Sequence, residues 1–226
     1  MNGFLYSVVL LSLASFTGAR VADHTYMPPA NTDLTVSYSI VLKSRKSDTG
    51  IGETYNGGVK TVFVSEAQVR LRLVSLMRMQ SIFILPGSRP QQKVAIAKES
   101  GRNRYKYYLS ESDWRQYNMK YEGLACHLQD DTMRILGYAC RKAIITLKNK
   151  ETVTVYYTPA ILEPALADAE PLFSGVPGLA LRYEYTHRKG TIIYTATNIN
   201  RHSIDPAVFS VPGNDFPVKK YIPGKG

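Results

Sequence analysis

Short segments with alternating hydrophobic and polar residues dominate the chain after residue 33. The clearest is 34–42, where every second side chain from Leu34 to Leu42 is apolar and the intervening ones are mostly small and polar. A period of two is typical of a strand with one buried face. Similar patterns predict further strands at 59–64, 68–73, 80–85, 92–97, 105–109, 124–128, 134–147, 152–158, 180–186 and 191–197.

The connections between these strands are short and contain turn formers. Gln129–Thr132 is expected to be a polar turn, with Gly137 at a bulge inside the long strand 134–147. Val176-Pro177-Gly178-Leu179 predicts a type II turn, because proline presets φ at its second position and glycine accepts positive φ at its third.

Little helix is expected. Ser110 can cap a short helix over 110–116, with Asp113 three residues further on, and Trp114 should pack that helix onto the sheet. The stretch 159–171 could add one helical turn. The predicted fold class is therefore all-β and predominantly antiparallel: a curved sheet or incomplete β-barrel with one or two short helices.

The ends of the chain suggest export. Residues 1–19 have an apolar core followed by small residues up to Ala19 and read as a signal peptide, since the run is shorter than the ~20 residues of a spanning helix. We expect an extended arm over 20–33, a single β domain over 34–211 and a loose tail over 212–226. The mature protein would then be secreted or periplasmic and would not span a membrane.

The net charge is +10, which favours anionic partners. The basic residues are dispersed along the chain, so nucleic acid is not an expected partner. Arg70 and Arg72 share one face of 68–73 and are interpreted as a solvated outer face, although they could meet an anionic ligand.

The two cysteines, Cys126 and Cys140, both follow the predicted signal peptide. In an oxidising compartment such a pair predicts a disulfide, which would stabilise the fold by ~3 kcal/mol for a loop of about 15 residues. Two buried free thiols are the alternative.

No catalytic motif is present. The histidines lack metal-ligand spacing, and neither a nucleophile elbow nor a phosphate-binding glycine loop occurs. Asp130 and Asp131 are neighbours in sequence and are interpreted as turn residues. The sequence predicts no enzyme activity, no cofactor, no metal site and no catalytic residues, and leaves the ligand-binding residues unknown.

The run Gly175, Val176, Pro177, Gly178 and Leu179 resembles the signature of the GLPGLI family, with Val176 in place of the usual leucine. The segments 135–143 and 155–161 resemble two further family segments in the same order. The resemblance covers roughly 34–211. It implies a secreted protein of the Gram-negative cell envelope, of unassigned activity, with a lipoprotein-carrier-like sheet whose apolar hollow holds acyl chains.

Two functions follow as hypotheses. The first is a non-enzymatic binding or carrier-like module for a lipid or for a hydrophobic or lipidated protein segment. The second is a structural or protein-interaction module of the envelope that has a protein partner and no small ligand. An outer-membrane barrel is less favoured, because charged residues such as Arg70 and Arg72 would line one face of its strands.

Overall fold

A computed structural model describes residues 33–44, 56–87, 90–187 and 190–223. The predicted signal peptide 1–19 and all of the predicted arm 20–33 except Asp33 lie outside the described residues. Within them, eleven strands form one sheet in the order β6-β5-β4-β3-β2-β1-β11-β10-β9-β8-β7, and every neighbouring pair of strands is antiparallel. The strands are β1 Leu34–Ser44, β2 Val59–Ser65, β3 Gln68–Val74, β4 Arg78–Ile84, β5 Val94–Ser100, β6 Asn103–Leu109, β7 Ala125–Ile135, β8 Tyr138–Thr146, β9 Thr152–Thr158, β10 Leu179–His187 and β11 Gly190–Asn200.

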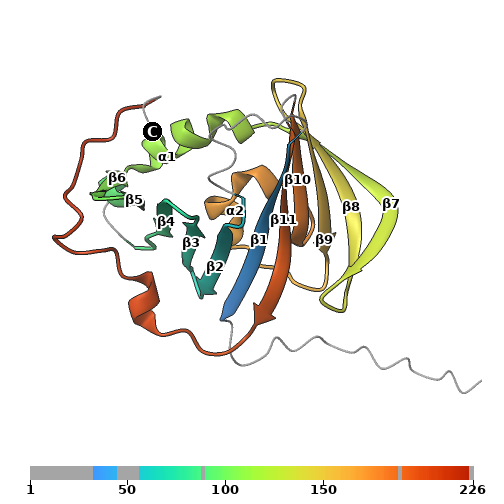
Figure 1. The fold of residues 1–226 in the computed structure, drawn as a ribbon, viewed down its shortest axis with the longest axis horizontal. Helices are drawn as coiled ribbons and strands as arrows, with labels where there is room; N and C mark the ends of the chain where they lie inside the picture. The colour runs from blue at the N-terminus through green and yellow to red at the C-terminus, as the bar shows by residue number, and fades with distance from the viewer. Residues whose placement is uncertain (1–32, 45–55, 88–89, 188–189, 224–226) are drawn as a thin grey trace, which may run out of the picture.

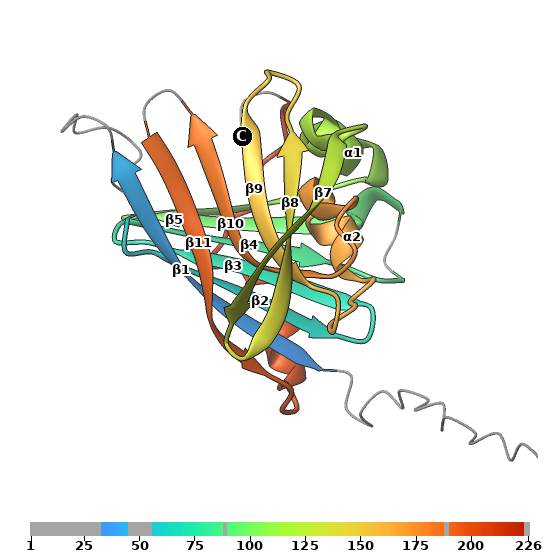
Figure 2. The same ribbon diagram turned by 90° about the vertical axis from the view of Figure 1, so that its right-hand side faces the viewer.

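The sheet curves without closing, because β6 and β7 are its two edges and do not pair with each other. Strands of the β2–β6 half cross those of the β7–β11 half steeply, and β1 with β11 joins the two halves (Figure 2). The register between β1 and β11 shifts at Ser37/Tyr38, and Thr197 Oγ1 donates to the Ser37 carbonyl at 3.1 Å. This bulge lies where the two halves join, and bulges increase local twist.

Two short α-helices and four 3₁₀ turns complete the described chain, and the predicted fold class is confirmed. The elements are α1 Glu111–Asn118, α2 Leu166–Ala169, η2 Pro90–Gln92, η3 Met119–Tyr121, η4 Pro171–Phe173 and η5 Pro206–Phe209. The helices α1 and α2 lie on the concave side of the sheet (Figure 1).

The hydrophobic core fills much of this concave side. The alternation predicted for β1 is confirmed, since Leu34, Val36, Tyr38 and Ile40 are all at most 1% exposed. The helix predicted near Ser110 is also confirmed: Ser110 Oγ accepts from the Asp113 amide at 3.1 Å, and the Asp113 carboxylate accepts from the Ser110 amide at 3.2 Å. This reciprocal cap satisfies two amides at the start of α1.

Trp114 joins the core, as predicted, at 7% exposure. Its indole N–H donates to the carbonyl oxygen of Asp168 at 2.9 Å, and its ring stacks on Tyr117. Trp114 therefore also ties α1 to α2, a contact that the sequence pattern did not predict.

The predicted turn at Gln129–Thr132 is wrong. β7 runs unbroken through it, with a shift of register between Gln129 and Thr132, and the hairpin turn lies at Leu136 and Gly137. These two residues have φ of 50° and 84°. A two-residue hairpin turn of this kind matches the twist of the flanking strands and favours glycine, so Gly137 makes the turn instead of a bulge.

The predicted disulfide is absent from the structure, where Cys126 and Cys140 are free thiols. The corrected hairpin explains why. Cys126 pairs with Ile145, which lies five residues beyond Cys140 along β8. At about 3.3 Å per residue the two cysteines are separated by roughly 17 Å along the strands, whereas a disulfide needs Cα atoms within about 7 Å.

The predicted loose tail is also corrected for the residues described, up to 223. Lys106 of β6 receives a backbone hydrogen bond from Lys219 at 2.8 Å and donates one to Pro217 at 3.0 Å. Phe216 packs with Phe83 on the outer face of the sheet. The strands β4 and β5 are apolar on both faces, so their outer face needs a cover, and the C-terminal segment supplies it.

The turn η5, which precedes this segment, partly buries one of the two arginines expected in solvent. Arg70 donates to the Val208 carbonyl at 2.9 Å and to Ser81 Oγ at 3.1 Å, and its guanidinium lies 4.9 Å from the centre of the Phe83 ring. Burial, with a smaller contribution from Arg72, lowers the pKa of Arg70. Arg72 itself is exposed, as predicted.

Candidate functional site: a trough with a filled half and an open half

The concave side of the sheet forms a trough whose two halves differ. The segment 159–178, between β9 and β10, carries α2 and η4 and packs into one part of the trough, here called the filled half. The other part, the open half, lies toward the turns at 75–77, 101–102 and 147–151. Because the sheet is antiparallel throughout, these turns all belong to the same end of their strands.

On the inner face of the β1–β6 half, successive rows of cross-strand neighbours become more polar toward the open half. The two rows of cross-strand neighbours within the filled half consist of apolar and aromatic side chains: Leu34, Val64, Val69, Ile84, Val94, Leu109, and then Val36, Val62, Leu71, Ile82, Ile96, Tyr107. The next row toward the open half is mixed: Tyr38, Lys60, Leu73, Gln80, Lys98, Tyr105. The trough is thus apolar at depth and polar at its mouth.

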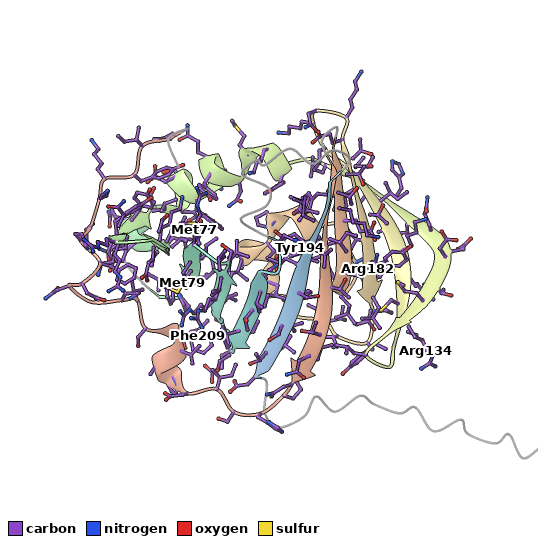
Figure 3. The ribbon with its side chains drawn as sticks, in the orientation of Figure 1. Met77, Met79, Arg134, Arg182, Tyr194 and Phe209 are labelled. Atoms are coloured by element: carbon purple, nitrogen blue, oxygen red, sulfur yellow. The ribbon has the colours of Figure 1, made fainter. Side chains whose placement is uncertain are left out.

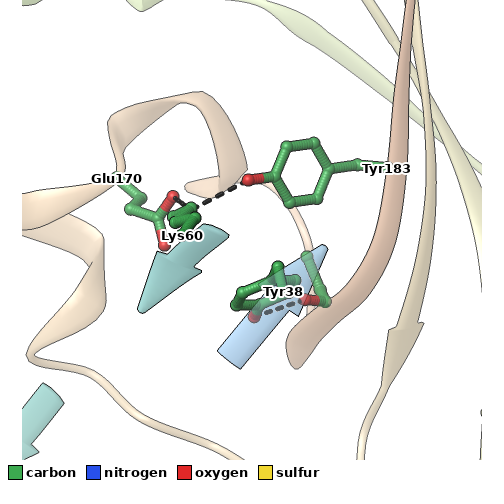
Figure 4. A network of polar contacts seen from close by, with 5 residues as sticks. Tyr38, Lys60, Glu170 and Tyr183 are labelled. Carbon is green, nitrogen blue, oxygen red and sulfur yellow. Dashed lines mark hydrogen bonds and ion pairs between the residues drawn. The ribbon is translucent and has the colours of Figure 1, made fainter. Parts of the chain in front are cut away.

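A buried ion pair marks the boundary between the two halves. Lys60 of β2, 8% exposed, pairs with the carboxylate of Glu170 from the segment 159–178. Its ammonium also donates to the phenol oxygen of Tyr183 at 2.9 Å (Figure 4). It lies 5.2 Å and 5.1 Å from the ring centres of Tyr38 and Tyr183. This arrangement compensates a charge that would be costly to bury alone.

The phenols around this ion pair remain protonated at neutral pH. Burial, and then the negative charge of Glu170, raise the pKa of both Tyr38 and Tyr183 well above the usual value. Tyr38 uses its proton to donate to the Ala180 carbonyl at 2.9 Å. The network therefore fastens the segment 159–178 and β10 to β1 and β2, a structural role.

The GLPGLI-like turn lies in the filled half and lines a cavity of about 280 Å³ together with α2, Glu163 and Tyr38. The predicted type II geometry is wrong: the Gly178 amide donates to the Val176 carbonyl at 2.9 Å, which makes a tighter three-residue turn around Pro177. Gly178 has φ of 150°, and a Cβ there would lie 2.2 Å from the Thr158 carbonyl oxygen. Glycine is required because the backbone of β9 passes so close.

A second carboxylate of this cavity, that of Glu163, has a long salt bridge. Arg201 approaches it at 3.7 Å. Burial raises the pKa of Glu163 more than Arg201 lowers it. The cavity is therefore apolar with two acids at its border, and the cations Lys60 and Arg201 already face those acids.

The open half contains two connected hollows on the inner face. One, of about 650 Å³, lies between β3–β4 and β9–β11, and the other, of about 500 Å³, lies over β3–β6. Leu73 and Gln80 line both, so they form one groove. Its first wall is mainly aromatic and aliphatic: Tyr121, Leu147, Tyr185, Ile192 and Tyr194.

The ring of Tyr194 stacks on that of Tyr183 at 4.5 Å and lies between the two halves of the sheet (Figure 3). Tyr185 meets both rings edge-on. Burial raises the pKa of Tyr185, so this phenol too is neutral. The tyrosine rings of the first wall are thus packed against one another and uncharged.

The second wall of the groove carries cations. Arg78 and Lys98 line it with Tyr105. Glu99 is a neighbour in sequence, but alternation along β5 directs its side chain to the outer face, where Arg104 binds it at 2.9 Å. Among the described residues no salt bridge to Arg78 or Lys98 occurs.

The structure brings some predicted site residues together and separates others. Gly175–Leu179 line or adjoin the filled half, and Cys126 touches this segment, since a Cβ at Gly175 would lie 2.9 Å from the Cys126 Cβ. Cys140 lies elsewhere in the core. In the described part of the chain, no group of three His, Cys, Asp or Glu side chains could hold a metal ion.

The sequence analysis missed Lys60, Lys98 and Gln80. The signal was available: Lys60 occupies the same strand face as Val62 and Val64, and Gln80 and Lys98 likewise interrupt the inward faces of their strands. A charged residue on an otherwise buried face indicates either a buried partner or an opening to solvent. Lys60 is the first case and Lys98 the second.

Searches with the sequence find no matching family model and no matching curated protein. A comparison with solved structures matches, among others, PNGF-II, with 14% identity, a TM-score of 0.47, and coverage of 84% of this chain and 31% of that one. MucB gives 11% identity and a TM-score of 0.42, covering 82% and 58%. The MucA/MucB complex of Pseudomonas aeruginosa gives 11% and 0.35, covering 80% and 56%.

The chain thus spans about a third of PNGF-II and somewhat over half of the MucB chains. No helix in the described residues is both long and apolar enough to cross a membrane.

Proposed function

We propose that this protein is a secreted, non-enzymatic binding module of the Gram-negative envelope, related to the GLPGLI family, that holds a lipid or a hydrophobic or lipidated protein segment. The observation that carries the proposal is the groove in the open half of the trough. It is concave and has apolar and aromatic lining residues, and each of its two hollows lies within the size range of ligand sites, about 300–1,000 Å³.

The contrast with the filled half supports this proposal. There the segment 159–178 already covers the apolar inner face, and the remaining cavity is about 280 Å³. In the open half Leu73, Tyr185 and Ile192 line a hollow that no described segment fills. A guest with an apolar part would cover these side chains and release the water in contact with them.

The experiment is lipid extraction and native mass spectrometry of the exported protein purified without detergent, followed by titration with the neutral fluorescent probe N-phenylnaphthylamine. We expect copurified amphiphile or saturable binding of the probe. The variant Leu73→Arg places a charge at the junction of the two hollows and should weaken probe binding at least about 10-fold. Leu128→Arg is the matched control, because Leu128 is 56% exposed on β7. No extracted lipid together with no probe binding contradicts the proposal.

The second candidate function is protein interaction at the free edge of the sheet. The β6 edge is partly covered by the C-terminal segment, whereas no described strand pairs with the outer side of β7. An extended segment of an envelope protein could pair there. Capture from envelope extract that is lost in a Leu128→Pro variant, with the probe still bound normally, would favour this function.

A further inference from the structure

We propose that the guest of the open half carries an anionic head group, a phosphate or carboxylate, which Lys98 and Arg78 bind while the apolar part lies against the tyrosine wall. This inference rests on the proposed function and adds the chemical class of the ligand. Its basis is a pair of cations that line a groove without a bound acid.

Lys60 and Lys98 can be compared directly because they occupy the same cross-strand row. The register links them through Leu73 and Gln80. Lys60 has its counter-charge in Glu170. Lys98 has only the ring of Tyr107, 5.7 Å from its ammonium. Lys60 thus has an internal counter-charge, whereas Lys98 lines a hollow and has no acid bound to it among the residues that the structure describes.

The charges lining the groove are net positive once their partners are counted. The cations are Arg78, Lys98 and Lys120, and the acids are Glu99 and Glu151. Glu99 is bound by Arg104 on the outer face. Glu151 lies across the groove at the β8–β9 turn and accepts a hydrogen bond from Asn149 at 2.8 Å.

Neutral hydrogen-bonding groups surround the cations. In the register Lys98 faces Gln80 on one side and Tyr105 on the other, and Arg78 faces Ser100. An anion beside Lys98 would have a guanidinium within the same wall and hydrogen-bond donors next to it. Charge-assisted hydrogen bonds of this kind contribute about 1.5–3 kcal/mol each, roughly 10- to 100-fold in affinity.

The arrangement also orients the guest. The rings of Tyr185 and Tyr194 and the side chains of Leu147 and Ile192 lie on the opposite wall. Among the described residues that line that hollow, the one cation is Lys120, which lies 4.9 Å from the centre of the Tyr121 ring and shares the hollow with the Glu151 carboxylate. A phosphate placed there would meet a carboxylate as well as a lysine, whereas an acyl chain would bury apolar area. The head group therefore belongs at β4–β5 and the chain at β9–β11.

The test is competition against N-phenylnaphthylamine by three ligands: dodecyl phosphate, the neutral detergent dodecyl maltoside, and inorganic phosphate. We expect dodecyl phosphate to bind at least about 10-fold more tightly than dodecyl maltoside, and inorganic phosphate to compete weakly. Raising the salt concentration should reduce the preference, because partly exposed charges are screened.

Variants localise the effect. Lys98→Gln and Arg78→Gln should each remove most of the preference for dodecyl phosphate, whereas Lys98→Arg should retain it. Lys142→Gln is the control, since Lys142 pairs with Asp131 at 2.7 Å away from the groove. Urea midpoints close to that of the wild type in all four variants should exclude misfolding as the cause.

The outcomes separate the two proposals. Equal binding of dodecyl phosphate and dodecyl maltoside by the wild type overturns the head-group assignment but leaves the binding function intact. Inorganic phosphate competing as well as dodecyl phosphate also overturns it, because the site would then recognise the free anion. Binding of none of the ligands and of no probe overturns the proposed function itself.

Discussion

The filled and open halves of the trough are made by the same strands, yet a lysine is buried and paired in one half and accessible in the other. Lys60 and Lys98 occupy one cross-strand row, in which Leu73 and Gln80 lie between them. Lys60 is buried under the segment 159–178, which brings Glu170 to it. Lys98 lies where no such segment passes and keeps access to the groove. Whether a lysine of this row has a structural role or can bind a ligand therefore depends on whether the segment 159–178 covers it.

The two halves also differ in backbone conformation, because the irregular backbone lies in the segment that covers the filled half. The segment 159–178 contains the tight turn at Pro177 and the close contact of Gly178 with β9. It is held by several polar ties besides apolar packing, among them Lys60–Glu170 and the bond from Trp114 to Asp168. Within the described ranges, the open half has only short turns between strands and no comparable cover.

The largest expected effect on stability is at Gly178, which allows the segment 159–178 to pack closely against β9. Gly178→Ala should destabilise the protein by roughly 3 kcal/mol or more, because a Cβ there would lie 2.2 Å from the Thr158 carbonyl oxygen and φ is 150°. Urea unfolding followed by tryptophan fluorescence measures the change.

Gly137→Ala is the matched control. Gly137 has φ of 84°, but nothing lies within 4 Å of its added Cβ. This variant should lose only about 1 kcal/mol, from backbone strain alone. Equal losses in the two variants would show that the filled half does not depend on close seating of the turn.

The second effect compares the two lysines directly. Lys60→Met leaves the Glu170 carboxylate without its cation in a nearly buried site and should cost about 3 kcal/mol of unfolding free energy. Lys98→Met should cost less than about 0.5 kcal/mol, since Lys98 is only half-buried and has no salt bridge. Chemical denaturation of both variants gives the comparison.

A double variant checks the cause of the Lys60 effect. Lys60→Met with Glu170→Leu removes both charges and should recover much of the stability, because a buried ion pair can be replaced by apolar residues of similar volume. A double variant as unstable as Lys60→Met alone would mean that packing, and not the orphaned carboxylate, is responsible.

Much of the filled half was predictable from local patterns, and the reasons are physical. Alternation identified β1 and its buried face, and the Ser110–Asp113 cap identified α1, because both signals are short-range. The hairpin turn was misplaced because Asp130 and Asp131 suggested a turn more strongly than Leu136-Gly137 did. In the structure the two aspartates are exposed on an edge strand, where polar residues need no turn to reach solvent.

The open half was not predictable in the same way. Its groove depends on which strands face each other across the trough and on where the segment 159–178 ends, neither of which is local. The docking of Phe216 against Phe83 is equally non-local. Only the interrupted inward faces of β2, β4 and β5, at Lys60, Gln80 and Lys98, could have indicated where the apolar interior stops.

A smaller effect concerns the acid at the border of the filled half. The pKa of Glu163 is raised in the folded protein, chiefly by burial. A carboxyl with a raised pKa contributes most to stability below its unfolded pKa, and this contribution is lost as pH rises through the folded pKa. Glu163→Gln should therefore stabilise the protein slightly at pH 7, and the gain should disappear toward pH 4.

Urea midpoints of wild type and Glu163→Gln across that range test this. Glu151→Gln is a control, because Glu151 lies at the β8–β9 turn and not in this cavity. Destabilisation of Glu163→Gln at pH 7 would mean that the ion pair with Arg201 outweighs the cost of burial.

The smallest expected effect is that of oxidation, which should leave stability unchanged. Burial raises the pKa of both Cys126 and Cys140, so little thiolate is present to react. A bridge would also require Cys126 to leave its contact with Gly175, which would loosen the segment 159–178. Alkylation of the exported, denatured protein should label both thiols without prior reduction, and reductant should not move the urea midpoint. Labelling that appears only after reduction would show that the β7–β8 register rearranges and that the filled half tolerates the loss of this contact.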